Sequence, residues 1–157
     1  MKQESTGSVE RVVQQMHARL SDDLALRECE RRALLFMAHF DTQEYQEAAN
    51  LFALEGVWNR ADGVINGRAD FMRRMEARSP GIFVRHVITN MRAKRLNETE
   101  IRVDSYVTVY RHDFTGSIMV PASLSAPDVM GRYSDVFRMI EGEWLLYEKS
   151  VVVDFKR

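Results

Sequence analysis

Histidine is the side chain best suited to acid–base chemistry near neutral pH, and this chain has four. His86 lies in the apolar segment 83–90, which has the composition of a strand. Strand alternation predicts that one face of this segment carries four side chains: Val84, His86, Ile88 and Asn90. Such a histidine points into a half-buried environment, although the pattern alone also fits a core histidine whose hydrogen bonds are satisfied. The other histidines are predicted to be solvated or to lie near a helix end: His17, His39 and His112.

Asp41 is the second residue whose position suggests chemistry, because it directly follows an apolar helical run that ends at Phe40. A carboxylate is unfavourable at a helix C-terminus. Asp41 could instead begin the next helix as the N-cap before Thr42, and the spacing leaves open whether it caps a helix or faces a pocket. His39, Asp41 and His86 would together supply the two imidazoles and one carboxylate of a non-haem iron site. Nothing in the sequence brings His39 inside the fold, so no metal site is predicted.

The elements that must position these residues are mostly helices first and strands afterwards. Helical spacing predicts helices over residues 9–20, 24–40, 42–53 and 68–78, with a break at residues 21–23. Alternation and turn residues predict strands over residues 56–60, 63–67, 82–96, 101–110, 131–140 and 144–155. The proline-containing stretch 112–130 is predicted to be a loop. Helices and strands that occupy separate parts of the sequence indicate an α+β fold. In this fold a long curved antiparallel sheet is expected to pack against three to four helices and to enclose a pocket.

Length and composition limit the possible classes of protein. A chain of 157 residues fits one domain, predicted here as residues 9–157 after a disordered lead over residues 1–8. The formal net charge of −1 argues against a nucleic-acid partner, and no apolar run is long enough for a membrane span. The lone Cys29 cannot form an internal disulfide, which favours the reducing cytoplasm. The chain has no P-loop, dinucleotide fingerprint or nucleophile elbow, and no cofactor is expected.

Several segments, in this order and at these separations, carry a resemblance to a known family. They are the helix ending in Phe40-Asp41, the segment 66–68, the strand segment 85–90, the strand segment 105–110, and Gly131-Arg132-Tyr133 followed by Trp144. Residues 30–155 thereby resemble the SnoaL-like branch of the nuclear transport factor 2-like superfamily. The resemblance implies a cone of curved sheet closed by helices. Related dehydratases, dehydrochlorinases and isomerases use an Asp–His pair inside the cone, and Asp41 and His86 match that pair.

The resemblance implies a cofactor-independent lyase or isomerase, of the dehydratase or ketosteroid-isomerase kind. Its substrate would be small and largely apolar, such as a cyclic, polyketide-like or steroid-like molecule. His86 would abstract a proton, and Asp41 would hold the imidazole in one tautomer. Asn90, on the same strand face, could hydrogen-bond a developing oxyanion, which is worth about 3 kcal/mol in well-studied enzymes.

Phe36 departs from the family pattern, because related dehydratases often carry a tyrosine five residues before the aspartate. A hydroxyl would then have to come from Tyr106, Tyr110 or Tyr133. The residues predicted to contact substrate are Phe36, Phe40, Trp58, Ile88, Asn90, Tyr106 and Tyr133.

Two other functions stay open. Phe36 favours a non-catalytic domain that binds a small molecule. The final strands also resemble the small structural subunits of ring-hydroxylating dioxygenases. The open sheet face around Arg85, Val87 and Thr89 needs a cover, and the resemblance implies a homodimer, with trimers as the variant.

Overall fold

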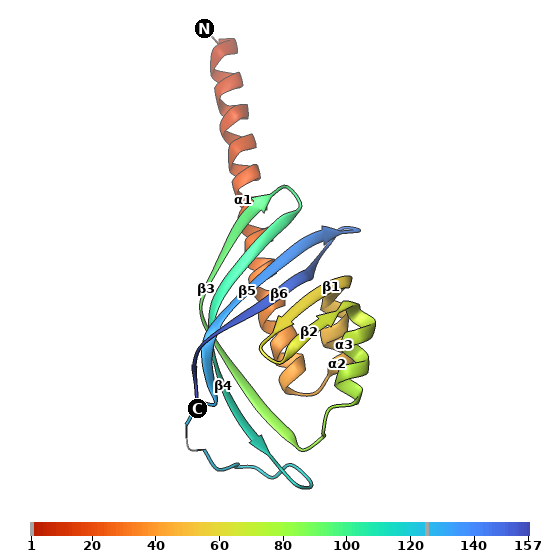
Figure 1. Cartoon of the computed structure of the whole chain (residues 1–157). Coiled ribbons are helices and arrows are strands. Elements are labelled where there is room, and N and C mark those ends of the chain that lie inside the picture. Colours follow the sequence, from red (N-terminus) through yellow and green to blue (C-terminus); the bar gives the residue numbers. More distant parts are fainter. Residues whose placement is uncertain (1, 125) are drawn as a thin grey trace.

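Three helices and six strands make up the part of the chain that the structure describes (Figure 1). The structure is a computed structural model, and it describes the fold of residues 2–124 and 126–157 and the side chains of these residues from residue 8 onward. The helices are α1 (Lys2–Asp41), α2 (Tyr45–Leu51) and α3 (Gly67–Glu76). The strands are β1 (Phe52–Arg60), β2 (Gly63–Asn66), β3 (Ile82–Asn97), β4 (Glu100–Asp113), β5 (Val129–Ile140) and β6 (Glu143–Lys156).

The six strands form one curved, unclosed sheet in the order β2-β1-β6-β5-β4-β3. Neighbouring strands are antiparallel except β1 and β6, which run parallel, so the sheet is mixed where the sequence predicts an antiparallel one. Register shifts interrupt the β3–β4 and β5–β6 pairings, and such bulges bend a sheet. α1 lies on one side of the sheet, and α2 and α3 lie beside β1 and β2 (Figure 1). The predicted α+β class and curved sheet are confirmed.

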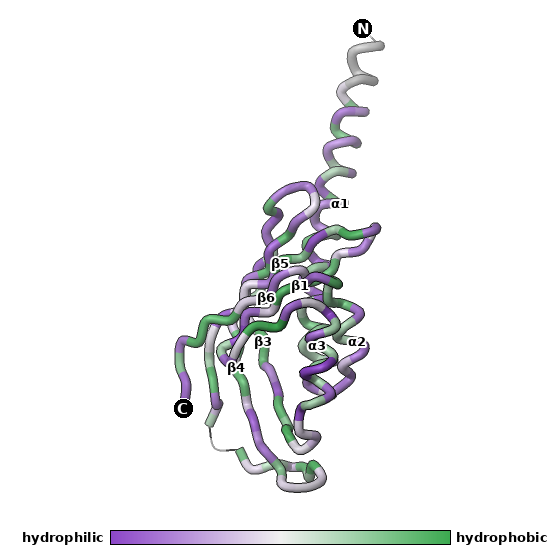
Figure 2. Tube along the Cα trace, turned by 45° about the vertical axis from the view of Figure 1, so that its right-hand side comes forward, coloured by the Kyte–Doolittle hydropathy of each residue, from purple (hydrophilic) through white to green (hydrophobic). Residues whose placement is uncertain are grey.

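α1 is one helix, and the predicted break at residues 21–23 is wrong. The carboxylate of Asp22 accepts a hydrogen bond from Arg95 of β3, so a contact with the sheet outweighs the weak helix propensity of this segment. The first half of the helix projects beyond the sheet (Figure 1) and mixes hydrophilic with hydrophobic residues (Figure 2). The predicted disordered lead over residues 1–8 falls almost entirely on residues whose side chains lie outside the described part, and it stays a prediction.

Aromatic side chains fill the space between α1, β1 and α3. The ring of Phe36 packs against Trp58 and Phe71, with centroids 5.5 Å and 5.7 Å away, and Phe52 lies 6.1 Å from it. All four residues are buried. Burying a side chain of this size stabilises a fold by about 1.5–3 kcal/mol. This cluster therefore fixes the last turns of α1, and with them Asp41, against the sheet.

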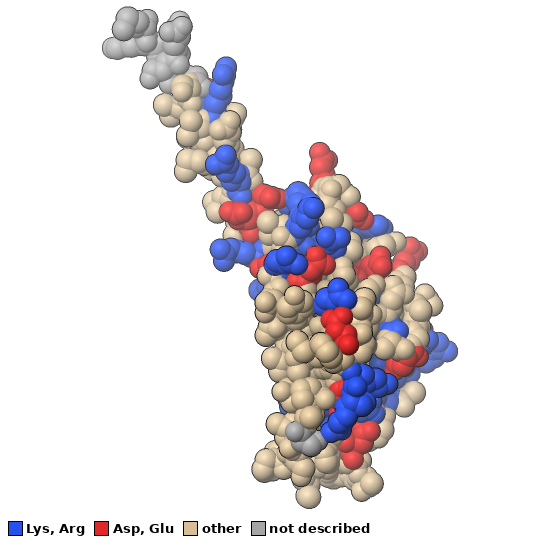
Figure 3. Space-filling view, turned by 60° about the vertical axis from the view of Figure 1, so that its left-hand side comes forward, with Lys and Arg blue, Asp and Glu red and all other residues tan. Residues whose placement is uncertain are grey.

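The surface of the body carries charges of both signs. Figure 3 shows basic and acidic side chains interspersed over one face, with no large area of a single sign. None of the helices in the described part of the chain combines the length and the apolar character needed to cross a bilayer.

Candidate active site

His86 and Asp41 meet inside the fold, although 45 positions separate them in the sequence. Nδ1 of His86 lies 2.5 Å from Oδ1 of Asp41, and the backbone N–H of His86 donates to Oδ2 at 2.7 Å. The two side chains are only 9% and 10% exposed. Because an ionised carboxylate can only accept, Nδ1 carries the proton in this pair. Nε2 then has no hydrogen-bond partner among the described residues and holds a lone pair.

The turn after α1 fixes Asp41 against β3. Gln43 adopts a positive φ of 63°, and its side-chain amide donates to the carbonyl of Ile82 at 3.1 Å. The guanidinium of Arg85 donates to the backbone carbonyl of Asp41 at 3.0 Å. Both carboxylate oxygens of Asp41 contact His86, and the N-cap of α2 is Glu44. Asp41 therefore does not cap α2, and of the two interpretations that the spacing left open, the carboxylate turned toward the strand histidine is observed.

His39 takes no part in this pair. Its Nδ1 lies 2.7 Å from Oε2 of Glu44. Among the described residues, no three His, Cys, Asp or Glu side chains are grouped as ligands for a metal ion. The structure therefore does not assemble a ligand set from His39, Asp41 and His86.

A cavity of about 430 Å³ opens beside His86, between the end of α1 and the sheet. Its apolar and aromatic lining consists of Phe40, Trp58, Ala61, Val84, Val109, Val129, Tyr133, Val151 and Val153. The ring of Phe40 lies edge-on to His86, with centroids 5.8 Å apart. A cavity of this size accommodates a small molecule. The structure thus brings four of the predicted site residues to one chamber that the dyad adjoins: Phe40, Trp58, His86 and Tyr133.

Two other predicted contact residues belong to the core behind this chamber. Phe36 is fully buried among aromatic rings and does not line the cavity. Ile88 is half-buried and packs against the same core. Both shape the site from behind, and neither is placed to touch a bound molecule.

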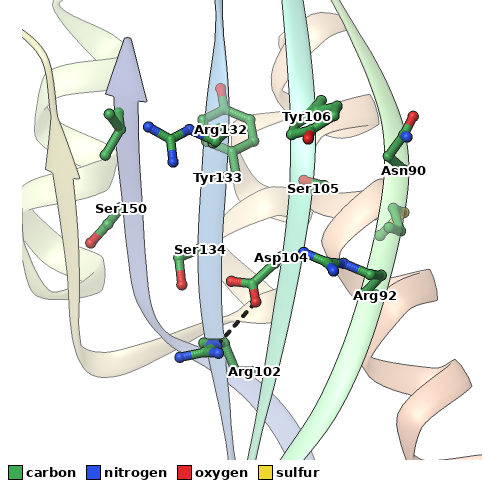
Figure 4. Close-up of a pocket in the computed structure, with 12 residues that line it drawn as sticks. Asn90, Arg92, Arg102, Asp104, Ser105, Tyr106, Arg132, Tyr133, Ser134 and Ser150 are labelled. Carbon is green, nitrogen blue, oxygen red and sulfur yellow. Dashed lines mark hydrogen bonds and ion pairs between the residues drawn. The ribbon is translucent and has the colours of Figure 1, made fainter. Parts of the chain in front are cut away.

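Asn90 lies elsewhere, contrary to the prediction that it faces the same chamber. It lines an outer hollow of about 630 Å³ on the other side of the sheet (Figure 4). The β3–β4 register shifts between Thr89 and Arg92, and Asn90 takes a positive φ of 53° there. A bulge of this kind breaks the alternation that placed Asn90 beside His86. The proposed oxyanion contact by Asn90 has no support in this geometry.

Tyr106 also lines the outer hollow, so its assignment to the substrate pocket is wrong (Figure 4). Its side chain is 46% exposed, whereas its neighbours Ser105 and Val107 are buried. Alternation along β4 therefore sends Tyr106 away from the cone interior. Tyr133 is the one hydroxyl candidate of the three that lines the cavity beside His86.

A buried ion pair lies next to this cavity, and it was not among the predicted site residues. Nζ of Lys149 lies 2.9 Å and 3.0 Å from the two carboxylate oxygens of Asp135, and both residues are buried. Burial lowers the pKa of Lys149 and raises the pKa of Asp135, while their mutual attraction opposes both shifts. Asp135 lies two residues from both Tyr133 and Phe137, so its side chain points to the same inner face of the sheet. Strand alternation could have predicted this position from the sequence. Lys149 could not be found this way, because the β5–β6 register shifts between Val136 and Phe137.

Two polar groups of the cavity wall can donate to a bound molecule. Burial, reinforced by the charge of Asp135, raises the pKa of the Tyr133 hydroxyl above its ordinary value, so it stays protonated. Nζ of Lys149 lies 3.6 Å from the centre of the Tyr133 ring and supports it from behind. Nε1 of Trp58 is the one buried side-chain polar atom in the described part of the chain that lacks a hydrogen-bond partner. Buried donors are normally paired, so a ligand atom is a candidate partner.

Comparison with known proteins gives matches of family and of fold. The model of the SnoaL-like domain matches residues 11–149. A putative scytalone dehydratase from Novosphingobium aromaticivorans superposes with a TM-score of 0.72 at 18% identity, covering 87% of this chain and 88% of that one. ActVI-ORFA from Streptomyces coelicolor gives 0.64 at 20% identity, with 82% and 96% covered. A Catenulispora acidiphila protein in complex with S-DNPA gives 0.65 at 19% identity, with 84% and 95% covered.

Among curated proteins, none matches the chain. At the identities of these solved structures, the superpositions show a shared fold and nothing finer. The family match is broader evidence, because it spans most of the chain and includes Asp41, His86 and the cavity-lining residues up to Tyr133. The chain belongs to the SnoaL-like family.

Proposed function

We propose that the protein is a lyase or isomerase that needs no cofactor and removes a proton from a carbon next to a carbonyl or a leaving group. The observation that carries this proposal is the 2.5 Å contact between Asp41 and His86 at the edge of a cavity with an apolar and aromatic wall. A general base of this type needs one ring nitrogen fixed and the other facing the substrate. Family membership supports an enzyme or a small-molecule-binding domain, and the neighbour described as a putative scytalone dehydratase supports the lyase class.

In the proposed reaction, Nε2 of His86 takes the proton from carbon. The electron pair of the broken C–H bond forms a C=C bond as a leaving group departs, or moves to a carbonyl oxygen to give an enolate. Asp41 stabilises the imidazolium without accepting its proton. The protonated hydroxyl of Tyr133 hydrogen-bonds the oxygen on which charge develops. His86 then returns the proton, to departing hydroxide in an elimination or to another carbon in an isomerisation, so the reaction balances without a redox partner.

The test measures proton loss directly. Purified protein is incubated in D₂O with cyclic ketones and β-hydroxyketones, and the disappearance of the C–H signal is followed by NMR. We expect exchange or elimination with the wild type and a loss of about a hundredfold or more in His86→Gln. Tyr106→Phe is the matched control, since Tyr106 lies in the outer hollow, and it should keep the wild-type rate. Rates that His86→Gln leaves unchanged would remove the basis of the proposal.

Binding without turnover is the second candidate function. Phe36 stands where related dehydratases often carry a tyrosine, and it is buried away from the cavity, so the hydroxyl of that position is lost. Under this function the same compounds bind, as shown by chemical-shift changes, and no C–H exchange occurs with any of them.

The third candidate is a structural subunit of an oxygenase. A neighbour described as a putative aromatic ring hydroxylase from Novosphingobium aromaticivorans shares the fold at 14% identity with a TM-score of 0.65. This function requires a large partner that co-purifies with the protein. Purification of a stable assembly of this chain alone would count against it.

We also propose that two copies pair through the outer face of the sheet, as a cytoplasmic homodimer. Exposed apolar side chains follow one another across four strands on that face: Val87, Tyr106, Met130 and Val152. Exposed apolar groups on adjacent strands are typical of an interface. Light scattering after gel filtration should give a dimer for the wild type and a monomer for Val152→Asp. The buried free thiol of Cys29 is suited to the reducing cytoplasm.

A further inference from the structure

The cavity beside His86 carries more positive than negative charge. Its basic lining residues are Arg60, Arg78, Arg111, Lys156 and Arg157, and its carboxylates are Asp62 and Asp128. Ion pairs join Arg60 to Asp62 at 2.8 Å, Arg111 to Asp113 at 2.8 Å and Arg157 to Asp128 at 2.9 Å. Within the described residues, Arg78 and Lys156 form no ion pair with a carboxylate, although the charge of Arg78 contributes to lowering the pKa of the Asp113 carboxyl.

Arg78 is the more informative of these two residues, because it is half-buried and held in place. Its guanidinium carbon lies 4.6 Å from the centre of the Phe40 ring, and Nη1 donates to the hydroxyl of Tyr45 at 2.9 Å. A guanidinium offers five N–H donors in a rigid planar fork, so most of these donors meet no acceptor in the described part of the protein. Arginine rarely loses solvent without a matching anion. An anion from outside the protein would complete this arrangement.

Phe40 links Arg78 to the proposed base. One ring contacts both groups, since the centre of the Phe40 ring lies 4.6 Å from the Arg78 guanidinium and 5.8 Å from the centre of the His86 ring. Arg78, Phe40 and His86 all line the same cavity. A molecule lying along Phe40 would therefore have an apolar middle, with a cation at one end and an imidazole at the other.

We propose that the substrate carries a carboxylate, which Arg78 binds while His86 acts on a carbon elsewhere in the molecule. This names the substrate class of the site described under Proposed function and rests on that function for the action of His86. The two oxygens of a carboxylate match the guanidinium fork. When Arg78 holds the carboxylate, the reacting C–H bond lies at a fixed distance from Nε2 of His86. The binding energy of the carboxylate is then used to orient the substrate for reaction.

The experiment compares two probes that differ in charge and scarcely in shape, 2-naphthoate and 2-naphthamide, titrated by calorimetry. We expect the wild type to bind the carboxylate about tenfold more tightly or better, as hydrogen bonds to charged groups allow. The preference should shrink as salt is raised. Arg78→Met should bind both probes equally, with an unchanged affinity for the amide, and Arg78→Lys should keep part of the preference. Arg74→Met is the matched control, because Arg74 lies four residues earlier, on α3, pairs with Asp70 and does not line the cavity.

Three results would overturn the proposal. They are equal or tighter binding of the amide by the wild type, a carboxylate preference that survives in Arg78→Met, and no binding of 2-naphthoate at millimolar concentration. Should Arg78→Met not fold, the wild type still decides the matter. The NMR signal of the Arg78 Nε–H group is identified by its absence from the spectrum of Arg78→Lys. In the wild type this signal must shift when 2-naphthoate is added and must not shift when 2-naphthamide is added.

The fate of this proposal can be separated from that of the proposed reaction. Anion binding does not need the base, so His86→Gln should retain the carboxylate preference. A preference that persists while no compound turns over leaves the anion site standing and removes the reaction. Turnover of neutral compounds at a rate that Arg78→Met does not change supports the reaction and removes the anion site.

Discussion

The two faces of the sheet each carry a hollow, and the same strands contribute to both. The outer hollow is the larger, at about 630 Å³ against about 430 Å³ for the inner cavity. Its ion pairs are exposed and local, such as Arg132 with Asp154 on the neighbouring strand at 2.9 Å (Figure 4 shows Arg132). In the inner cavity, Asp41 and His86 are about nine-tenths buried and hold each other in one orientation.

This difference teaches that burial and a fixed direction of the polar side chains, more than the size of a hollow or its number of charges, make it suitable for chemistry. Water screens the arginines of the outer hollow, and each can change partner at little cost. Inside the cone the dielectric is lower, so a polar group without its partner is costly and a paired group is held firmly. The outer hollow is therefore assigned to association and the inner one to the proposed reaction.

The largest expected effect is on the buried ion pair beside the inner cavity. Lys149→Met leaves Asp135 charged and unpaired in the interior, and we expect the free energy of unfolding in urea to fall by about 3–5 kcal/mol. The equivalent change outside, Arg132→Met, breaks an exposed pair and should cost about 1 kcal/mol or less.

A double variant shows how much of the lost stability comes from the missing attraction and how much from the unpaired charge that is left buried. Lys149→Met combined with Asp135→Leu removes both charges and should recover most of the stability that Lys149→Met loses. If Lys149→Met costs no more than Arg132→Met, the two faces do not differ in the way argued above.

Much of this architecture could be predicted from the sequence, because it follows from local periodicity. The strands of the final meander were placed within a few residues, since alternation and turn residues both act over short distances. The parallel pairing of β1 with β6 could not be predicted in the same way, because it depends on how distant segments meet. The break expected at residues 21–23 failed for the same reason, since Asp22 is bonded to Arg95 of β3.

Part of the candidate site could be predicted from the sequence, and most of that prediction came from the resemblance to the family. Spacing left Asp41 undecided between a helix cap and a pocket, whereas the family pattern joined it to His86. The register shift at Asn90 reversed a side chain that alternation placed inside. Arg78 was missed because the helix predicted over residues 68–78 ends at Glu76, so the helical period does not tell which way the Arg78 side chain points.

A smaller effect should separate two tyrosines on opposite faces of the sheet. Tyr133→Phe removes the hydroxyl that we propose hydrogen-bonds the developing charge, and turnover should fall about a hundredfold, or about 2.7 kcal/mol. Tyr106→Phe removes an exposed hydroxyl from the outer hollow and should leave turnover within twofold. Steady-state kinetics on any compound that the wild type converts makes the comparison. Equal losses in the two variants would mean that the faces are not functionally distinct.

The curvature that creates the inner cavity should depend on Gly131. A Cβ at this position would lie 2.3 Å from the backbone carbonyl oxygen of Val152, beside the register shift in the β5–β6 pairing. Gly131→Ala should therefore force the strands apart and lower the free energy of unfolding by about 1–3 kcal/mol, with weaker ligand binding in the cavity. Gly116→Ala is the control, because no atom lies within 4 Å of its added Cβ. Equal stability of the two variants in urea would show that the strands tolerate the extra carbon.

The smallest expected effect concerns a partly exposed ion cluster on α1, which contrasts with the buried pair. Hydrogen bonds from Arg31 and then Arg32 outweigh partial burial and lower the pKa of the Glu28 carboxyl from 4.5 to about 2. Because the pKa is depressed in the folded state, the stabilisation is complete well above pH 4.5 and is lost as the pH falls toward 2. Glu28→Gln should lower stability by about 1 kcal/mol or less at pH 7, and 1 M salt should reduce that difference.

Near pH 2 most of the difference between Glu28→Gln and the wild type should disappear, because the wild-type carboxyl is then about half protonated in the folded state and almost fully protonated in the unfolded state. Urea unfolding at pH 7, 4 and 2.5 measures this trend, and Glu10→Gln, at an exposed position of the same helix, is the control. Lys149→Met should respond differently, because its loss arises from desolvation in the interior and added salt cannot screen it. If 1 M salt reduces both losses by the same fraction, then water reaches Asp135, and the buried and exposed ion pairs do not differ as proposed.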